Sequence, residues 1–377
     1  MVAGDFFSDQ GLLDVGLVRM SQSGEINTSF APTFDDTVLS LQVLEIDGVP
    51  VLLAGGFFTE VNGQERIGIA VLNMDGTLRP EFARLFPDVF SAVFTILPVP
   101  ERGTVLLAGN WEDVYESPGD AGPTTDGRYA SLVEVEWPGG AVRQSFLAGE
   151  TLDFGNSLVR GLAPGFGESG WTVAVAGSLI FDAATGAPGA ILNQSGELVA
   201  FTQGVSGTAF SITQDVERGR YVFSGDLEDG FEALALLEYS VVPFERTRAV
   251  SLDDLDFNSQ AWTTQSLPGG RVFVGGKSLF FPETAAIVIE PEGGLGSFSG
   301  EIGGGEVQRS RTLSSGIYLG GTFFDFRVRD LISGSVSEWI PANGLVRLRH
   351  DLTLDTSFVP TIGGFMTDIV ELPPGTP

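Results

Sequence analysis

Several residue types are scarce in this chain of 377 residues. It has no cysteine, one histidine (His350) and one lysine (Lys277). Without cysteine there are no disulfides, thiolate metal sites or thiol nucleophiles. A single histidine excludes metal centres built on several histidines, and with only five tyrosines it leaves little room for the His–Tyr–Arg sets that some polysaccharide-cleaving enzymes use. We therefore expect no metal and no cofactor.

The chain also lacks long apolar runs. None approaches the ~18 residues that a membrane-spanning helix needs, so we expect no membrane insertion. No basic, apolar secretion signal precedes the first predicted strand. Because Met1 falls inside that strand, we expect the sequence to be a mature or excised segment of a longer protein.

Positive charge is scarce as well. The 20 basic residues face 49 Asp and Glu, which gives a formal net charge of −29. A surface this acidic repels nucleic acid and anionic lipid. We expect neither as a partner.

An apolar, glycine-containing phrase is what the chain has in abundance. It is clearest as VLLAGGFF over Val51–Phe58 and returns about every fifty residues. The other copies begin at Val2, Val105, Val173, Tyr221, Val272 and Ile317. A period of this length in a β-rich, glycine-rich chain is typical of a β-propeller.

Each repeat has the same internal order. In the clearest copy, apolar runs at Val38–Glu45, Val51–Phe58, Ile67–Asn73 and Thr77–Phe82 are separated by Asp-Gly, Pro and polar turns. Such runs predict four antiparallel strands. The fourth run usually ends on a phenylalanine, which we expect to pack between neighbouring blades because a lone sheet cannot bury both faces. These residues are Phe30, Phe82, Phe146, Phe201, Phe298 and Phe358.

The two ends of the chain complement each other. The sequence begins within a second strand, and Phe365–Leu372 followed by a Pro-Pro-Gly turn reads as a first strand with nothing after it. Pairing these ends removes exposed sheet edges. The prediction is an all-β fold: a single-domain, seven-bladed β-propeller of four-stranded antiparallel blades over residues 1–377, closed by the N- and C-terminal strands. The predicted blades are 365–377 with 1–30, 37–82, 89–146, 157–201, 207–249, 257–298 and 305–358.

The string LLAGGFFTEVNGQERIGIAVLNMDGTL, with Thr-Ser-Phe endings at Phe30 and Phe358, resembles the bacterial delta-60 repeat. The resemblance is close over 51–82 and 343–372 and moderate elsewhere. It implies a propeller and a place in a large secreted or surface-attached bacterial protein. The family carries no catalytic residues that could be transferred to this chain.

The remaining motifs carry little chemistry. Asp47-Gly48 and Asp75-Gly76 resemble fragments of calcium loops, but no ladder of aspartates accompanies them and a β-turn explains them better. His350 reads as a surface or turn residue. If the first strand of each repeat lines a central channel, about half of the polar residues there should point inward. The channel candidates are Gln42, Arg160, Trp262, Gln308, Arg309 and Arg311.

Two connections are long, Glu112–Arg128 and Asp325–Asn343. Both follow a second strand, so they should rise from the same face, on roughly opposite sides of the ring. Insertions on one face of a repeat protein are often its binding apparatus. Aromatic and arginine side chains dominate interface energetics, so the predicted binding residues are Tyr115, Arg128, Arg327 and Trp339.

Two classes of function stay open. The first, favoured by the sparse chemistry, is a non-catalytic extracellular interaction or structural module: a rigid disc that binds protein or glycan in a bacterial surface or filament assembly. The second is a carbohydrate-active enzyme, a glycosidase or polysaccharide lyase, because paired carboxylates are available among 49 acidic residues.

Overall fold

The computed structural model describes residues 1–8, 11–12, 16–82, 84–117, 120–124, 129–147, 157–165, 171–181, 185–229, 232–240, 244–251, 260–277, 283–360 and 363–374. Within these ranges the chain is built of strands, and the one helix is a short 3-10 turn, η1 (Pro100–Arg102). No helix in the described part of the chain is long and apolar enough to cross a membrane. The predicted all-β propeller of small antiparallel sheets is confirmed.

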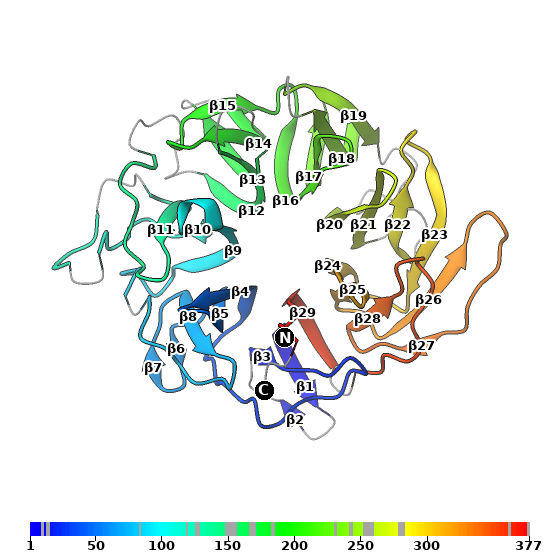
Figure 1. Cartoon of the computed structure of the whole chain (residues 1–377). Coiled ribbons are helices and arrows are strands. Elements are labelled where there is room, and N and C mark those ends of the chain that lie inside the picture. Colours follow the sequence, from blue (N-terminus) through cyan, green and yellow to red (C-terminus); the bar gives the residue numbers. More distant parts are fainter. Residues whose placement is uncertain are drawn as a thin grey trace.

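The sheets stand around a central axis with one strand of each facing inward (Figure 1). Each of these inner strands contacts the next in cyclic order, and the last contacts the first. The inner strands are β29 (Gly363–Ile369), β4 (Val38–Ile46), β9 (Ala92–Val99), β12 (Leu158–Pro164), β16 (Ser206–Asp215), β20 (Gln260–Leu267) and β24 (Val307–Leu313).

Antiparallel strands follow outward from each inner strand. The second strands are β1 (Val2–Ser8), β5 (Val49–Gly56), β10 (Thr104–Asn110), β13 (Thr172–Phe181), β17 (Arg220–Asp229), β21 (Arg271–Lys277) and β25 (Gly316–Gly321). The third strands are β3 (Leu17–Val18), β8 (Ile69–Asn73), β11 (Leu132–Glu136), β14 (Thr185–Asn193), β18 (Glu232–Ser240), β22 (Thr284–Ile289) and β28 (Leu345–Leu348). There is also a short strand, β2 (Gly11–Leu12). A short hairpin is formed by β6 (Glu60–Val61) and β7 (Gln64–Glu65).

The fourth strand differs from the expectation. It is regular in three sheets, as β15 (Leu198–Phe201), β19 (Arg246–Ser251) and β23 (Leu295–Ile302). In the other four sheets it shrinks to one β-bridge, as between Leu72 and Leu78. The chain turns soon after that bridge. In the third sheet, for example, the Phe146 amide donates to the Arg143 carbonyl at 3.0 Å. This local turn uses the backbone groups that a longer strand would pair.

The turn directs the phenylalanine side chains into the seams between sheets. Phe82 packs on Trp137 of the next sheet, with ring centroids 5.9 Å apart, and Phe30 lies against Gly76 of the sheet that follows its own. Both rings are buried. Packing between neighbouring blades, as predicted, is therefore observed for these two residues.

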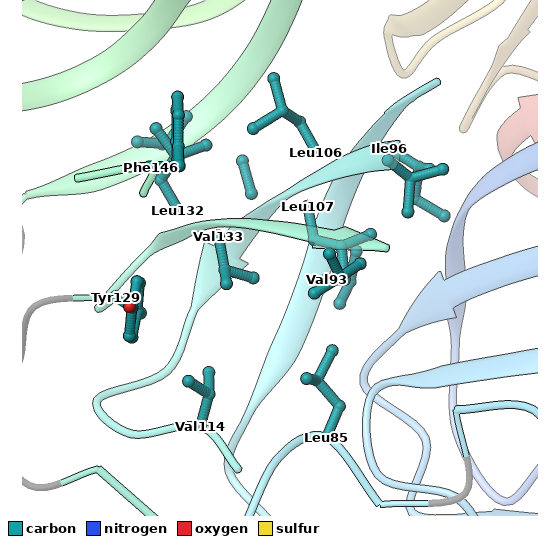
Figure 2. Packing of buried hydrophobic residues seen from close by; sticks show 14 of the residues in the cluster. Leu85, Val93, Ile96, Leu106, Leu107, Val114, Tyr129, Leu132, Val133 and Phe146 are labelled. Atoms are coloured by element: carbon teal, nitrogen blue, oxygen red, sulfur yellow. The ribbon is translucent and has the colours of Figure 1, made fainter. Parts of the chain in front are cut away.

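The core within a blade comes from the alternating apolar residues of the first three strands. In the third sheet, side chains from β9, β10 and β11 interleave with residues of the adjoining loops (Figure 2). The labelled residues include Val93, Ile96, Leu106, Leu107, Leu132 and Val133, all buried. This core continues without a break into the neighbouring sheets, so each blade is supported by the next.

The two ends of the chain share one sheet. β1 pairs antiparallel with β29, from Val2 opposite Ile369 to Phe7 opposite Gly363. Phe365 and Leu372 are half-buried. The buried apolar residues at this end of the chain are Met366, Ile369 and Val370. A register shift between Ala3 and Gly4 changes which side chains of β29 face inward, and a simple alternation could not reveal it.

The connection 325–343 is a β-structure rather than a loop. β26 (Asp325–Asp330) pairs antiparallel with β23 of the neighbouring sheet, and β27 (Ile340–Pro341) pairs with β26. Figure 1 shows both strands at the rim, outside β28. Backbone hydrogen bonds therefore tie the last sheet to the one before it.

Candidate functional site

The glycine of the repeated phrase creates a bulge in each inner strand. A Cβ on Gly109 would lie 1.9 Å from the Ala92 carbonyl oxygen, and one on Gly177 would lie 1.9 Å from the Leu158 oxygen. Only glycine permits this close approach of two backbones. Opposite the glycine the inner strand carries one extra residue, as Phe94 shows between Val93 and Thr95. A bulge of this kind re-aims side chains.

The same bulge recurs in all seven inner strands that the structure describes. Its extra residue and the one after it both belong to the channel lining, with one exception, Gln308. In cyclic order from β29, the bulge residues are Thr367, Leu39, Phe94, Arg160, Phe210, Trp262 and Gln308. We call them the mouth ring.

The mouth ring lies near the beginning of the inner strands. The second strands run the opposite way, so they end at this level: Asn110 at the end of β10 pairs with Ala92 at the start of β9. The long segments after β10 and β25 therefore leave from the same face as the mouth ring. The channel below the ring encloses a cavity of about 440 Å³, within the roughly 300–1,000 Å³ of small-molecule sites.

Four adjacent members of the ring form a continuous aromatic and cationic arc. The Arg160 guanidinium carbon lies 5.6 Å from the centroid of Phe94 and 5.4 Å from that of Phe210. Phe210 in turn stacks on Trp262, with centroids 4.5 Å apart and planes 18° apart. Cation–π attraction and stacking hold the arc together without any carboxylate.

Charge in the channel is opposite in sign to charge on the whole chain. Its lining contains Arg160, Arg309 and Arg311 but one carboxylate, Asp368. The Arg311 Nε lies 3.7 Å from Asp368 Oδ1, whereas no carboxylate in the described part of the chain forms an ion pair with the other two arginines. A patch of net positive charge within a chain of −29 focuses anions towards it.

Burial affects two of these guanidinium groups. It lowers the pKa of Arg309, where the repulsion of Arg160 and Arg311 adds to burial and the attraction of Asp368 opposes it. The channel walls also desolvate Arg160 and lower its pKa. In both cases burial disfavours the charged form of the guanidinium.

The structure places five of the six predicted channel residues in the lining; Gln308 instead donates to Glu306. This exceeds the expected half because a bulge turns two consecutive residues inward. The sequence reasoning missed Phe94 and Phe210. Aligning the repeats on their second glycine, and reading the residue opposite it in each inner strand, would have found them.

Tyr115 is buried, and its polar groups already have partners in the protein. It is 7% exposed, its hydroxyl accepts a hydrogen bond from Arg84 Nη2 at 2.6 Å, and the Arg84 guanidinium lies 4.1 Å from its ring centroid. The Tyr115 amide also donates to the Leu85 carbonyl. The second predicted residue of this segment, Arg128, lies outside the described residues.

The structure brings the other two predicted binding residues together. The Arg327 guanidinium lies 4.3 Å from the Trp339 ring centroid, and it also donates to Glu301 and Glu283. Trp339 is 39% exposed. The pair lies on the β26–β27 extension at the rim, and its binding role stays a prediction.

The side chains of the remaining polar motifs already contact neighbouring protein groups. The Asp75 carboxylate accepts from both the amide and the hydroxyl of Thr77, at 2.9 and 2.6 Å, and His350 lies exposed with Nε2 3.1 Å from the Ser314 oxygen. Within the described ranges, no three His, Cys, Asp or Glu side chains gather as a metal site would require.

The fold and channel define the class of protein, a β-propeller with a basic, aromatic channel mouth. A family model described as "Domain of unknown function (DUF5122) beta-propeller" matches residues 51–82 and 331–358. No curated protein matches the chain. Among solved structures, "Structure of Dos1 propeller" is similar with a TM-score of 0.50 and 11% identity, over 93% of this chain and 88% of that one. At that identity the likeness shows the fold alone.

Proposed function

We propose that the protein is a non-catalytic binding module that holds its ligand at the mouth of the central channel. The observation that carries this proposal is the pair of unpaired arginines, Arg160 and Arg309, set among aromatic rings in a chain of net charge −29. A partly buried cation that lies in no ion pair within the described residues, such as Arg309, is costly for folding alone. The presence of these arginines in a cavity is best explained by a partner that neutralises them.

The surrounding face extends the binding surface. The segments that follow β10 and β25 leave from the same side as the mouth ring, and they carry Tyr115, Arg128, Arg327 and Trp339. A protein or glycan partner seated on the channel mouth would reach these segments. Tyr115 and Arg327 would act mainly by fixing the shape of the surface, because their polar groups already have partners.

The alternative, a carbohydrate-active enzyme, needs a positioned acid and base, usually two carboxylates. The channel lining has one, Asp368, and it already accepts hydrogen bonds from the Leu41 and Ile369 amides at 2.9 and 2.8 Å. This arrangement favours binding over hydrolysis at the channel.

The cellular role that we propose is structural or adhesive, as a rigid disc in an extracellular or cell-surface assembly of bacterial origin. The resemblance of 51–82 and 343–372 to the delta-60 repeat supports this setting. The acidic, cysteine-free composition is compatible with it.

A glycan and peptide array, combined with a reducing-end assay on acidic and neutral polysaccharides, tests the proposal. We expect binding without turnover, and we expect it to weaken at least tenfold when Arg160 and Arg309 are both changed to Gln. Turnover of any polysaccharide that these changes abolish would replace the proposal by the enzyme alternative. Binding that survives them but is lost with Trp339→Ala would move the site to the rim.

A further inference from the structure

Three kinds of chemistry converge in the channel. The first is the arc of the mouth ring, in which the stacked rings of Phe210 and Trp262 lie beside the Arg160 guanidinium. The stack ends at Trp262, which is only half-buried, and the next ring position, Gln308, is not aromatic. Flat apolar groups next to a polar rim suit a ligand that has an apolar face and polar edges.

The second is a belt of uncharged polar side chains directly below the mouth ring. Hydroxyl groups come from the inner strands β4, β9, β16 and β20, and two amides lie nearby. Both amide nitrogens already donate to backbone carbonyls, but an amide oxygen and a hydroxyl oxygen each have two lone pairs to accept with. The belt therefore matches a ligand that carries several hydroxyl donors. Its members are Ser40, Thr95, Ser211, Thr213, Thr263, Gln42 and Gln265.

The third is the pair of channel cations, which lie on two well-separated inner strands. Arg160 is on β12 and Arg309 on β24, with β16 and β20 between them on one side of the ring and β9, β4 and β29 on the other. Arg309 donates through Nε to the Thr367 carbonyl at 2.9 Å and through Nη1 to the Gln308 carbonyl at 3.2 Å. Its Nη2 has no acceptor within the described part of the chain.

Carboxylates near this pair are already engaged. Asp368 accepts from two backbone amides, and Glu306, which does not line the channel, accepts from Trp262 Nε1 at 3.2 Å and from Gln308. Neither lies in an ion pair with Arg160 or Arg309. Both guanidinium groups line the same cavity and lie in no ion pair within the described residues, so an external anion can reach them there. Guanidinium geometry matches a carboxylate.

We propose that the channel binds an acidic sugar residue, a pyranose ring that carries a carboxylate. The carboxylate lies between Arg160 and Arg309, the apolar face of the ring packs on the arc at Trp262, and the sugar hydroxyls bond to the Ser, Thr and Gln belt. This inference rests on the proposed function and narrows its ligand to one class. An acidic peptide side chain or inorganic phosphate could meet the arginines but would leave the belt and the arc unused.

The test is calorimetric titration of the full chain with four probes: a uronic-acid trisaccharide, the corresponding glucose trisaccharide, an aspartate-containing tripeptide and inorganic phosphate. We expect the uronic-acid trisaccharide to bind and each of the other three to bind at least tenfold more weakly. The affinity for the first should fall as salt is added, because ion pairing contributes to it.

Variants separate the contributions. Arg160→Gln leaves a shorter, polar side chain at an exposed position and removes its charge, and it should weaken uronic-acid binding at least tenfold. The matched control is Arg246→Gln on β19, which removes the same charge from a rim arginine that is paired with Asp229; it should leave affinity unchanged. Phe210→Leu should weaken binding, whereas Phe90→Leu, at a side chain 79% exposed outside the channel, should not.

The outcomes are distinguishable. Equal binding of the neutral and acidic trisaccharides, or an affinity that Arg160→Gln does not change, would overturn the acidic-sugar inference and leave a binding module with another ligand. Preferential binding of the tripeptide or of phosphate would do the same and name the replacement class. If none of the four probes binds, the acidic-sugar inference fails, and a blank glycan and peptide array would remove the proposed function too.

Discussion

The arginines of the blades and those of the channel differ in the groups that surround their guanidinium groups. Ten blade arginines form ion pairs with Asp or Glu, and several of them, such as Arg102 on Glu134, do so through two nitrogens at 2.7 and 2.8 Å. The ion-paired blade arginines are Arg79, Arg102, Arg143, Arg220, Arg246, Arg248, Arg327, Arg329, Arg347 and Arg349. In the channel, by contrast, Arg160 is held between aromatic rings and Arg309 between backbone carbonyls.

The difference separates fold from function. A buried ion pair contributes to structure because removing one partner strands the other charge. An arginine without a counter-charge contributes little to folding and is available for an external anion. The comparison therefore supports the proposal that the ligand binds in the channel.

The largest loss of folding stability should come from deleting β29, the inner strand that pairs with the N-terminal strand β1. Deleting residues 363–377 removes β29 and with it three buried side chains, Met366, Ile369 and Val370. At ~1.5–3 kcal/mol for each side chain, the loss is about 4–9 kcal/mol, comparable with the whole stability of a typical domain of about 5–15 kcal/mol. Urea unfolding measures it. A truncated chain that stays monomeric and unfolds at the parent's midpoint would show that β29 does not support the ring.

Removing an arginine from a blade ion pair should lower the free energy of unfolding more than removing an arginine from the channel. Arg220 is 6% exposed and bonds to Asp215, Glu238 and the Gly270 carbonyl. We expect Arg220→Ala to lower the free energy of unfolding by about 3–5 kcal/mol, because two buried carboxylates lose a partner. Arg160→Ala should lower it by only about 0.5–1 kcal/mol, the contribution of its cation–π contacts. Equal losses in urea unfolding would erase the distinction between the two regions.

Acid should weaken the blade pairs selectively. Burial alone would raise the pKa of Glu301, but hydrogen bonds and charge from Arg329 and Arg327 outweigh it and lower the pKa below the ordinary 4.5. The stability from this pair is fully present above that ordinary pKa and is lost as the pH falls through the lower, folded-state pKa. We expect Glu301→Gln to destabilise at about pH 7, and its difference from the parent to shrink as the pH falls through the folded-state pKa of Glu301.

The control for this titration is Glu245→Gln, at an exposed residue outside any ion pair in the described structure. Its difference from the parent should stay small over the same pH range. If the gap between Glu301→Gln and the parent stays constant as the pH falls, ionisation of Glu301 is not what holds β26 to β23.

The smallest effect concerns the one carboxylate of the channel. Asp368→Asn keeps an oxygen that can accept the Leu41 amide but removes the charge near Arg311. We expect an anionic probe to bind more tightly by roughly 0.5–1 kcal/mol, the size of a solvent-accessible ion-pair term. Asp229→Asn, at the rim, makes the same change in net charge. An equal gain in both variants would mean that overall charge, and not the channel, attracts the anion.

Most of the fold could be read from the sequence. The repeated glycine phrase predicted the second strands, the Asp-Gly turns predicted the ends of the third strands, and the half-units at Met1 and Phe365 predicted that the terminal strands lie together, as they do in the pairing of β1 with β29. Local patterns suffice here because strand alternation and tight turns are properties of neighbouring residues. The reduced fourth strands were missed because the competing turn, such as that at Phe146, has the same apolar composition as a strand.

The site was only partly predictable for a different reason. Arg160, Trp262, Arg309 and Arg311 could be suspected as channel residues from their strands alone. How these side chains are arranged in the channel depends on bulges that form only when two strands pair across the repeated glycine. The same bulges add Phe94 and Phe210 to the channel lining. Likewise, nothing local to Arg327 indicates that it leaves its own blade to bond with Glu301 of the neighbouring sheet.

The sequence by itself determined the class of fold, because periodic burial and turn chemistry are written into each repeat. Only the tertiary structure decided which polar residues meet in the channel. The packing of successive sheets brings together side chains from strands some fifty residues apart in the chain, and the distances between them are set only once the sheets stand around one axis.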